Sequence, residues 1–224
     1  MTRKPIVAID GPAGSGKSTV TKLLAQKLGF LFIDTGAMYR AVTLKALDSG
    51  TDMTDPAALT RVAEGCTIEL RNVGQETQVL LDGRDVSTEI RNPRLNPHLS
   101  PVAAVSGVRR RLVALQQQMG RIGGVVMEGR DIGTVVFPDA EVKIYLEATV
   151  AERTRRRALE MQGKNLPCDE AKVRAEIERR DHIDSTREDS PLRQADDAVL
   201  VITDGLSIEQ VVDKLAAIVA AKTA

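Results

Sequence analysis

The segment GPAGSGKS, at residues 11–18, fits the pattern G-x-x-x-x-G-K-[ST] of a phosphate-binding loop. It directly follows an apolar run over 5–10 and leads into a helix-periodic stretch over 17–28, the strand–loop–helix context that this loop requires. Its glycines allow backbone N–H groups to turn toward phosphate oxygens, and the start of the following helix adds a positive partial charge. We therefore expect a nucleotide-phosphate site at this loop.

The residue types within the loop predict separate roles. Lys17 is expected to reach the β- and γ-phosphates of a nucleotide, and the Ser18 hydroxyl is expected to coordinate Mg²⁺. The nucleotide-binding set that we assign to this loop comprises Gly11, Pro12, Ala13, Gly14, Ser15, Gly16, Lys17, Ser18 and Thr19.

Short apolar runs rich in β-branched residues alternate with helix-periodic stretches along most of the chain. The runs that we predict as strands cover 5–10, 30–34, 124–128, 142–146 and 198–203. The stretches that we predict as helices cover 17–28, 38–48, 107–120, 149–162 and 207–221. Strands that are apolar nearly throughout suit a parallel sheet covered on both faces, and their alternation with helices predicts an α/β, doubly wound fold.

Residues 65–92 break this alternation. The segments CTIEL, TQVLLDG and DVSTEI alternate apolar and polar residues and are separated by turn residues, which predicts a small antiparallel β insert. Residues 162–171, QGKNLPCDEA, carry Gly and Pro after an arginine-rich helix, a composition that favours a short mobile lid.

Composition argues against several classes of function. Lys and Arg total 31 and Asp and Glu total 31, so no global field favours nucleic acid or an anionic membrane. Three Phe, two Tyr and no Trp leave little surface for stacking single-stranded bases. The two cysteines, Cys66 and Cys168, lie far apart, which indicates reduced thiols and not a metal site. Since no apolar run is long enough for a signal peptide or a membrane span, we expect a cytoplasmic protein without nucleic-acid or membrane partners.

Phosphate-binding loops serve GTPases, motor and transport ATPases, and small-molecule kinases. The sequence contains neither the D-x-x-G switch nor the N-K-x-D base reader of a GTPase, and it is short for a large ATPase. A phosphate monoester is already largely ionised near neutral pH, because its second pKa is about 6, so a kinase for such an acceptor needs cations more than a base. Arginine clusters at 109–111, 153–157 and 179–180, in a chain with two histidines, favour this kind of acceptor.

Three further motifs carry a family resemblance: DTGAMYRAV at 34–42, EGRDIGTVVFPDA at 128–140 and RRDHIDSTRE at 179–188. With the phosphate-binding loop, they run in the order found in bacterial cytidylate kinases, a branch of the nucleoside monophosphate kinases among the P-loop kinases. The chain closely resembles this family over essentially its whole length. The resemblance implies direct in-line transfer of the γ-phosphoryl group of ATP to CMP or dCMP, with Mg²⁺, giving CDP or dCDP.

The resemblance also implies a single P-loop kinase domain over 1–224. Its implied parts are a core at 1–36, 98–150 and 182–224, a monophosphate-binding region with the β insert at 37–97, and a lid at 151–170.

Site residues follow from the same resemblance. Residues implied to bind the acceptor nucleotide are Thr35, Arg40, Ser100, Arg109, Arg130, Asp131, Arg180, Asp184 and Arg187. The acceptor phosphate is implied to meet Arg40, Arg130 and Arg187, with Thr35 nearby, the cytosine to meet Ser100, Arg109 and Asp131, and the ribose to meet Arg180 and Asp184. Residues implied to be catalytic are Lys17, Arg130, Arg153, Arg157 and Arg187. Arg156 is implied to join the loop in ATP binding and, with Arg153 and Arg157, to close the lid, while Glu128 is a candidate for orienting Mg²⁺ through water.

Several of these residues have alternative roles. Asp131 is suited to accept a hydrogen bond from the exocyclic amine that distinguishes cytosine from uracil, or it caps a turn. Asp184 meets a sugar hydroxyl, or it pairs with Arg180 or Arg187, which lie with it at i, i+4 and i+7 on one face of a predicted helix. The cluster at 153–157 is a lid or a solvated helix face.

Two alternatives to the cytidylate kinase function are a P-loop kinase for another small molecule, such as UMP, and a nucleotide-binding switch without turnover. Both would use the same phosphate-binding loop. A kinase for another small molecule would release ADP with a different acceptor, whereas a switch would bind ATP without acceptor-dependent release of ADP. For the cytidylate kinase function we expect a monomer.

Overall fold

The computed structural model describes residues 3–74, 76–163 and 165–223. At its centre is a five-stranded sheet in the order β2-β6-β1-β7-β8, in which every neighbouring pair is parallel. Its strands are β1 (Ile6–Asp10), β2 (Leu31–Asp34), β6 (Val125–Gly129), β7 (Val142–Glu147) and β8 (Val199–Ile202). Each coincides with a predicted apolar run to within one residue at either end, so the predicted parallel sheet is confirmed.

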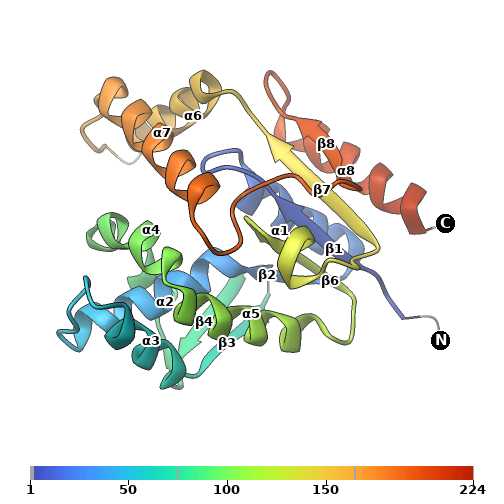
Figure 1. The fold of residues 1–224 in the computed structure, drawn as a ribbon. Coiled ribbons are helices and arrows are strands. Elements are labelled where there is room, and N and C mark those ends of the chain that lie inside the picture. The colour runs from blue at the N-terminus through green and yellow to red at the C-terminus, as the bar shows by residue number, and fades with distance from the viewer. Residues whose placement is uncertain (1–2, 75, 164, 224) are drawn as a thin grey trace.

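Helices cover both faces of this sheet (Figure 1). On one face, α1 (Lys17–Leu28) and α8 (Ile208–Thr223) share an apolar cluster with the strands. On the other face, the strands pack against α5 (Ser106–Gly120) and a π-helical turn over Ile132–Val136. Burial on both faces explains why β1, β2, β6 and β7 are apolar nearly throughout, whereas the edge strand β8 exposes Leu200 and Ile202. The doubly wound α/β class is confirmed.

The segment between β2 and β6 forms the predicted insert and the helices that support it (Figure 1). Its antiparallel sheet has the order β3-β4-β5, with β3 (Ile68–Val73), β4 (Glu76–Leu81) and β5 (Arg84–Asp85). Residue 75, in the β3–β4 connection, lies outside the described residues. The supporting helices are α2 (Thr35–Asp48), α3 (Pro56–Glu64), α4 (Asn96–Ala104) and α5. Together they enclose an apolar cluster of their own, so the insert is a packed unit beside the main sheet.

The third predicted strand of the insert, DVSTEI, is extended only at its first residue. The Asp85 carboxylate accepts hydrogen bonds from the N–H and the hydroxyl of Ser87, which turns the chain. A 3-10 helix over Glu89–Arg91 follows instead of a strand.

Helix α2 begins at Thr35, three residues before the predicted start at residue 38. The Asp34 carboxylate accepts a hydrogen bond from the Ala37 N–H at 3.0 Å and so caps the helix. This cap places Thr35 in the first turn, directly at the carboxyl end of β2.

Helices α6 (Val150–Gly163) and α7 (Glu170–Thr186) form a hairpin at the carboxyl ends of the strands, where α7 faces α4 of the insert (Figure 1). Residue 164, within the predicted lid, lies outside the described residues. Arg187 follows the end of α7 and has an extended backbone, with ψ of 146°. Its guanidinium donates two hydrogen bonds to the Ser190 carbonyl oxygen, which draws the chain out of the helix. The prediction that Arg180, Asp184 and Arg187 share one face of a helix is therefore wrong for Arg187, which lies beyond the end of α7.

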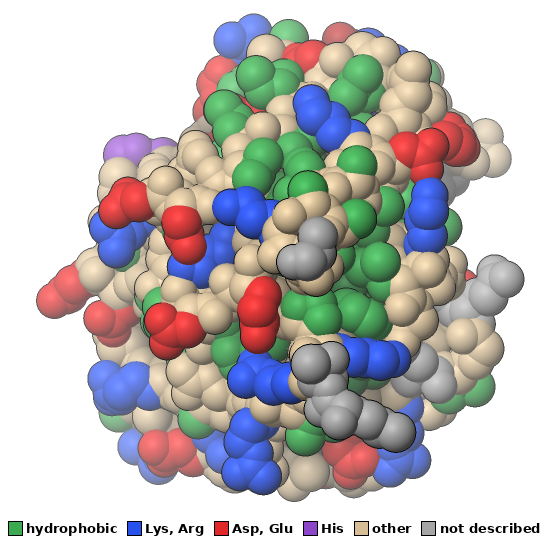
Figure 2. All heavy atoms as spheres, turned by 90° about the vertical axis from the view of Figure 1, so that its right-hand side faces the viewer, with side chains coloured by type: hydrophobic (Ala, Val, Ile, Leu, Met, Phe, Trp, Pro, Cys, Tyr) green, Lys and Arg blue, Asp and Glu red, His purple; other side chains and the backbone are tan. Residues whose placement is uncertain are grey.

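Among the described residues, no helix combines the length and the apolar character that crossing a membrane requires. On the face shown in Figure 2, Lys and Arg side chains are interspersed with Asp and Glu. This mixture is consistent with the formal net charge of zero.

Candidate active site

The phosphate-binding loop connects β1 to α1, and Lys17 forms hydrogen bonds back to residues of the loop. Lys17 is 5% exposed, and its Nζ donates hydrogen bonds to the Pro12 carbonyl oxygen at 2.7 Å and to the Ser15 Oγ at 3.2 Å. Gly16 has a φ of 89°, in the left-handed region that glycine adopts without strain. Ser18, in the first turn of α1, is exposed. The loop is thus already curved, and the helix start beside it is open to solvent.

Two arginines of α6 hold the outer side of this loop. Arg153 is 4% exposed; its Nη1 donates to the Ala13 carbonyl oxygen at 3.0 Å and pairs with Asp181 at 2.6 Å. Arg156 donates to the Ser15 carbonyl oxygen at 3.4 Å. Both arginines therefore contact the loop, as predicted for ATP-binding or catalytic residues. Asp181, which pairs with Arg153 from α7, was missed in the sequence analysis.

Arg157 lies on the solvent side of α6. Its Nη1 pairs with Glu160 at 2.6 Å, and the two side chains are 47% and 45% exposed. Burial lowers the pKa of Arg40, and the charge of Arg157 makes only a minor contribution in the same direction. The lid role of Arg157 stays a prediction.

Three carboxylates lie where β1, β2 and β6 end beside the loop: Asp10, Asp34 and Glu128. Glu128 is 4% exposed, and its Oε1 has no hydrogen-bond partner among the described residues. Burial, followed by the charge of Asp34, raises the pKa of Glu128 to about 7, against the opposing effects of Lys17 and the Ser18 hydroxyl. Buried polar atoms are normally satisfied, so this oxygen marks a place for a further ligand.

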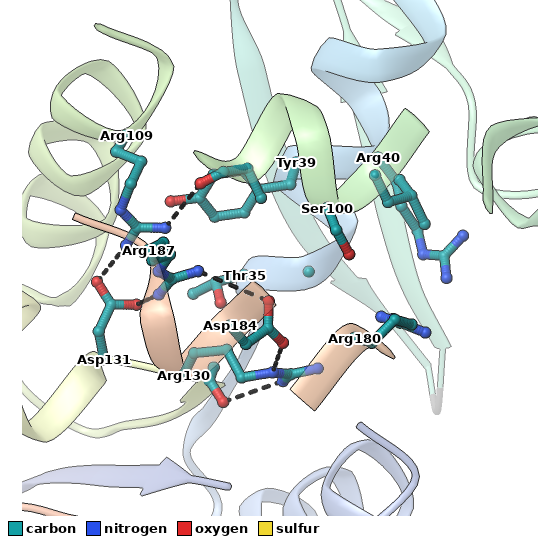
Figure 3. A pocket seen from close by; sticks show the side chains of 14 residues that line it. Thr35, Tyr39, Arg40, Ser100, Arg109, Arg130, Asp131, Arg180, Asp184 and Arg187 are labelled. Atoms are coloured by element: carbon teal, nitrogen blue, oxygen red, sulfur yellow. Dashed lines mark hydrogen bonds and ion pairs between the residues drawn. The ribbon is translucent and has the colours of Figure 1, made fainter. Parts of the chain in front are cut away.

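Every residue predicted to bind the acceptor nucleotide lines one pocket (Figure 3). These wall residues are Thr35, Arg40, Ser100, Arg109, Arg130, Asp131, Arg180, Asp184 and Arg187. The other wall residues, which were not predicted, are Gly36, Tyr39, Leu99, Ala103 and Gly129. The structure therefore gathers side chains from α2, α4, α5, α7 and the segment after β6 around one hollow.

One end of the pocket holds a buried carboxylate between two arginines. Asp131, 5% exposed, accepts a hydrogen bond from the Nη2 of Arg109 and lies 3.7 Å from the Nη2 of Arg187. The Arg109 guanidinium also lies 5.6 Å from the ring centroid of Tyr39, a cation–π distance. The Tyr39 hydroxyl has no hydrogen-bond partner among the described residues, and burial raises its pKa to about 12. Asp131 makes no side-chain cap to the π-helical turn that follows it, so the capping alternative is not observed.

At the other side of the pocket, Asp184 is held by an arginine that the sequence analysis did not choose. Its Oδ2 accepts from the Nε of Arg130 at 2.9 Å, and its Oδ1 lies 3.9 Å from the Nη1 of Arg187 (Figure 3). Of the two arginine partners predicted for Asp184, Arg187 therefore forms a pair, and the pair with Arg180 is not formed in the described structure. Burial and the charge of Arg130 lower the pKa of Arg180.

Arg40 and its neighbours form a crowded set of cations. Arg40 donates to the Ile90 carbonyl oxygen at 3.3 Å. Burial lowers its pKa to about 10, and the charges of Arg91 and Arg180 contribute in the same direction. Like charges held this close, partly out of water, favour the binding of an anion between them.

A family model described as Cytidylate kinase matches residues 7–221. A bifunctional pantoate ligase/cytidylate kinase of Synechococcus sp. (strain CC9605) is 51% identical over 217 residues, which cover 96% of this chain and 45% of the relative. A bifunctional pantoate ligase/cytidylate kinase of Synechococcus elongatus is 53% identical over 218 residues, covering 95% of this chain and 41% of the relative. The chain thus spans less than half the length of these relatives.

A solved structure of an uncharacterized protein from Eubacterium ventriosum superposes with a TM-score of 0.52 at 12% identity, covering 98% of this chain and 99% of the other. At that identity the likeness concerns the fold alone. The family match extends over nearly all of the chain, and the two relatives retain about half of their residues over the same span. The chain belongs to the cytidylate kinase family.

Proposed function

We propose that the chain transfers the γ-phosphoryl group of ATP to CMP and dCMP by direct in-line displacement, forming CDP and dCDP. The observation that carries this proposal is the pocket itself: Arg40 and Arg180 lie at one end of its arginine-rich wall, and the buried carboxylate of Asp131 lies at the other (Figure 3). A nucleoside monophosphate complements this pocket, because its phosphate at one end can meet the arginines and its base at the other end can meet the carboxylate.

On the donor side, the phosphate-binding loop and the start of α1 hold the ATP phosphates. Lys17 exchanges its hydrogen bonds within the loop for the β- and γ-phosphate oxygens. Arg153 and Arg156 brace the loop through the carbonyl oxygens of Ala13 and Ser15, and their guanidinium groups bring positive charge to the transferring phosphate. Arg157 joins them when the α6–α7 hairpin closes, and closure excludes the water that would otherwise hydrolyse ATP.

The residues beside the loop fit a Mg²⁺ ion. The orphaned Oε1 of Glu128 and the exposed Ser18 hydroxyl are hard oxygen donors, which Mg²⁺ prefers. Ser18 would bind the ion directly and Glu128 would orient it through water, with ATP phosphates supplying further oxygens. When bound, the ion neutralises charge on the β- and γ-phosphates.

The acceptor phosphate is held by arginines that surround it. Arg40, Arg130 and Arg187 line the pocket from α2, the end of β6 and the end of α7, and Thr35 stands beside them. Their charges offset the repulsion between two anionic substrates. The acceptor needs no general base, because its attacking oxygen is already ionised near neutral pH.

The base is read at the carboxylate end of the pocket. A cytosine presents an exocyclic amine, for which Asp131 is an acceptor, whereas uracil presents a carbonyl oxygen that the carboxylate repels. Arg109 and Ser100 complete this end of the wall, and Asp184 with Arg180 faces the ribose.

We also propose that the chain works as a monomer with the implied parts: a core at 1–36, 98–150 and 182–224, a monophosphate-binding region at 37–97, and a lid at 151–170. The supporting observation is that one chain supplies the whole pocket wall and the loop beside it.

The decisive experiment is an ADP-release assay with ATP and Mg²⁺ across CMP, dCMP, UMP, AMP, GMP, dTMP and shikimate. We expect release with CMP and dCMP well above that with the other acceptors. Preference for UMP, another monophosphate or shikimate would refute the proposal and identify the chain as a kinase for that small molecule. ATP binding without acceptor-dependent release would indicate a nucleotide-binding switch.

A further inference from the structure

Asp131 occupies a position at which an aspartate normally caps its own helix. It is the N-cap residue of the π-helical turn Ile132–Val136, yet within the described structure its carboxylate accepts no N–H of that turn. Asp55, the N-cap of α3, behaves as expected and accepts the N–H groups of Ala57 and Ala58. That the Asp131 carboxylate turns to Arg109 and not to its own turn therefore needs an explanation.

The N–H groups at the start of this turn are taken by a residue from another strand. Asp10, the last residue of β1, is 5% exposed, and its two carboxylate oxygens accept the Ile132 N–H at 2.8 Å and the Gly133 N–H at 2.7 Å. A helical turn leaves its first N–H groups without partners inside the turn. Asp10 therefore caps this turn, although it lies more than a hundred residues earlier in the sequence.

The fit around this cap is close. A side chain at Gly133 would place its Cβ 3.4 Å from the Oδ2 of Asp10 and 3.2 Å from the Cδ of Lys143. Burial raises the pKa of Asp10 to about 6, while both backbone hydrogen bonds oppose that rise and favour the ionised cap. Asp10 directly precedes Gly11, so the end of one strand carries both the phosphate-binding loop and this cap.

We propose that Asp10 is a positioning residue for base recognition: by capping the turn after Asp131, it leaves the Asp131 carboxylate free to face Arg109 and the pocket. The proposal rests on the function proposed above, in which Asp131 reads the cytosine amine. Without Asp10, the unsatisfied N–H groups of the turn attract the nearest carboxylate, which is that of Asp131, and draw it out of the pocket.

The test is Asp10→Asn, which keeps the shape of the side chain but provides one acceptor oxygen for two N–H groups. We expect the preference for CMP over UMP, measured as the ratio of kcat/KM, to fall about tenfold, the effect of one charge-assisted hydrogen bond. The loss should appear mainly in KM for CMP, with a much smaller change in KM for ATP. Asp55→Ala is the matched control: it removes an ordinary helix cap, lowers Tm and leaves the acceptor preference unchanged.

A double variant separates action through Asp131 from a general loss of structure. Asp10→Asn added to Asp131→Ala should cause no further loss of preference, because the residue it positions is already gone. An additive further loss, or a wild-type preference in Asp10→Asn, would overturn the proposal. If Asp10→Asn does not fold, Asp10→Glu tests the same contact, because it keeps both carboxylate oxygens but displaces them from the two N–H groups by one methylene, with the same expected fall and the same contrary result. Lack of CMP turnover in the unaltered chain would instead refute the proposed function.

Discussion

Arg109 and Asp131 form an ion pair in which the two side chains are only 3% and 7% exposed. Burying both charges costs desolvation energy that such a pair recovers incompletely, so the pair fits the base recognition proposed above better than a purely stabilising role. It lies in the pocket wall, where a base could reach the carboxylate.

Replacing Asp131 with Ala should therefore affect both recognition and folding. The preference for CMP over UMP should fall at least about tenfold, because the acceptor for the cytosine amine is lost. The free energy of unfolding should fall by about 3 kcal/mol, because Arg109 is left as a buried, unpaired charge. Steady-state kinetics with both acceptors and denaturant unfolding measure the two effects; an unchanged preference would move base recognition to another residue.

Replacing Lys17 with Ala should lower kcat by about a thousandfold, because a preorganised charge beside the transferring phosphate is removed. Lys22→Ala is a matched control on the same helix, since Lys22 pairs with Glu76 at 2.8 Å near the surface. Circular dichroism should show both variants folded, and only the first inactive. Turnover like that of the unaltered chain in Lys17→Ala would refute the assignment of the loop.

Glu128→Gln should make the protein more stable and less active. The pKa of Glu128 is about 7 in the folded chain and 4.5 in its ordinary state, so ionising this carboxyl disfavours folding as the pH rises through that interval. Relative to the unaltered chain, the variant should gain up to about 3 kcal/mol of unfolding free energy at about pH 8 and much less at about pH 5. Activity should fall because the variant lacks the carboxylate that is proposed to orient Mg²⁺ through water.

Thermal unfolding at the two pH values, with the exposed Glu64→Gln as control, measures this difference. A gain in Tm that does not depend on pH would show that burial of the Glu128 charge is not its cause.

Replacing Arg153 and replacing Arg157 should affect stability differently, although both replacements should lower turnover. Arg153→Ala leaves Asp181 as a mostly buried charge without its partner and should cost about 3 kcal/mol of unfolding free energy as well as activity. Arg157→Ala, on the solvent side of α6, should change unfolding by at most about 0.5 kcal/mol while lowering kcat. Denaturant unfolding and steady-state kinetics of both variants test this; a stability loss confined to Arg157→Ala would contradict the placement of α6.

The sequence predicted the architecture because the main signals are local. The apolar runs, the glycine loop and the helical periods each specify their own element, and parallel strands bring their carboxyl ends to one edge, where Thr35 and Arg130 then meet. The extended backbone at Arg187 was not foreseen, because it depends on a hydrogen bond to a carbonyl oxygen in an irregular segment.

Partner choice within the pocket could not be predicted for a different reason. Asp184 has several arginines within reach, and the free-energy differences between such pairs are small. Sequence spacing offered Arg180 and Arg187 as partners, whereas in the fold Asp184 pairs with Arg130 and Arg187. Asp10 gave no sequence signal for its role, since its partners lie more than a hundred residues away. Tyr39 stands within the quoted motif at 34–42, one helical turn after Thr35, and that spacing could have identified it.

The most direct measurement is the fate of a label carried on the γ-phosphoryl group of ATP. Incubation with CMP and Mg²⁺, followed by separation of the nucleotides, should show the label in CDP, with little in inorganic phosphate and none in CDP when Lys17 is replaced by Ala. Label that appears only in inorganic phosphate would contradict the account of this pocket as a CMP site. Label that stays in ATP with CMP, but moves into the product of another monophosphate in a parallel incubation, would contradict it as well.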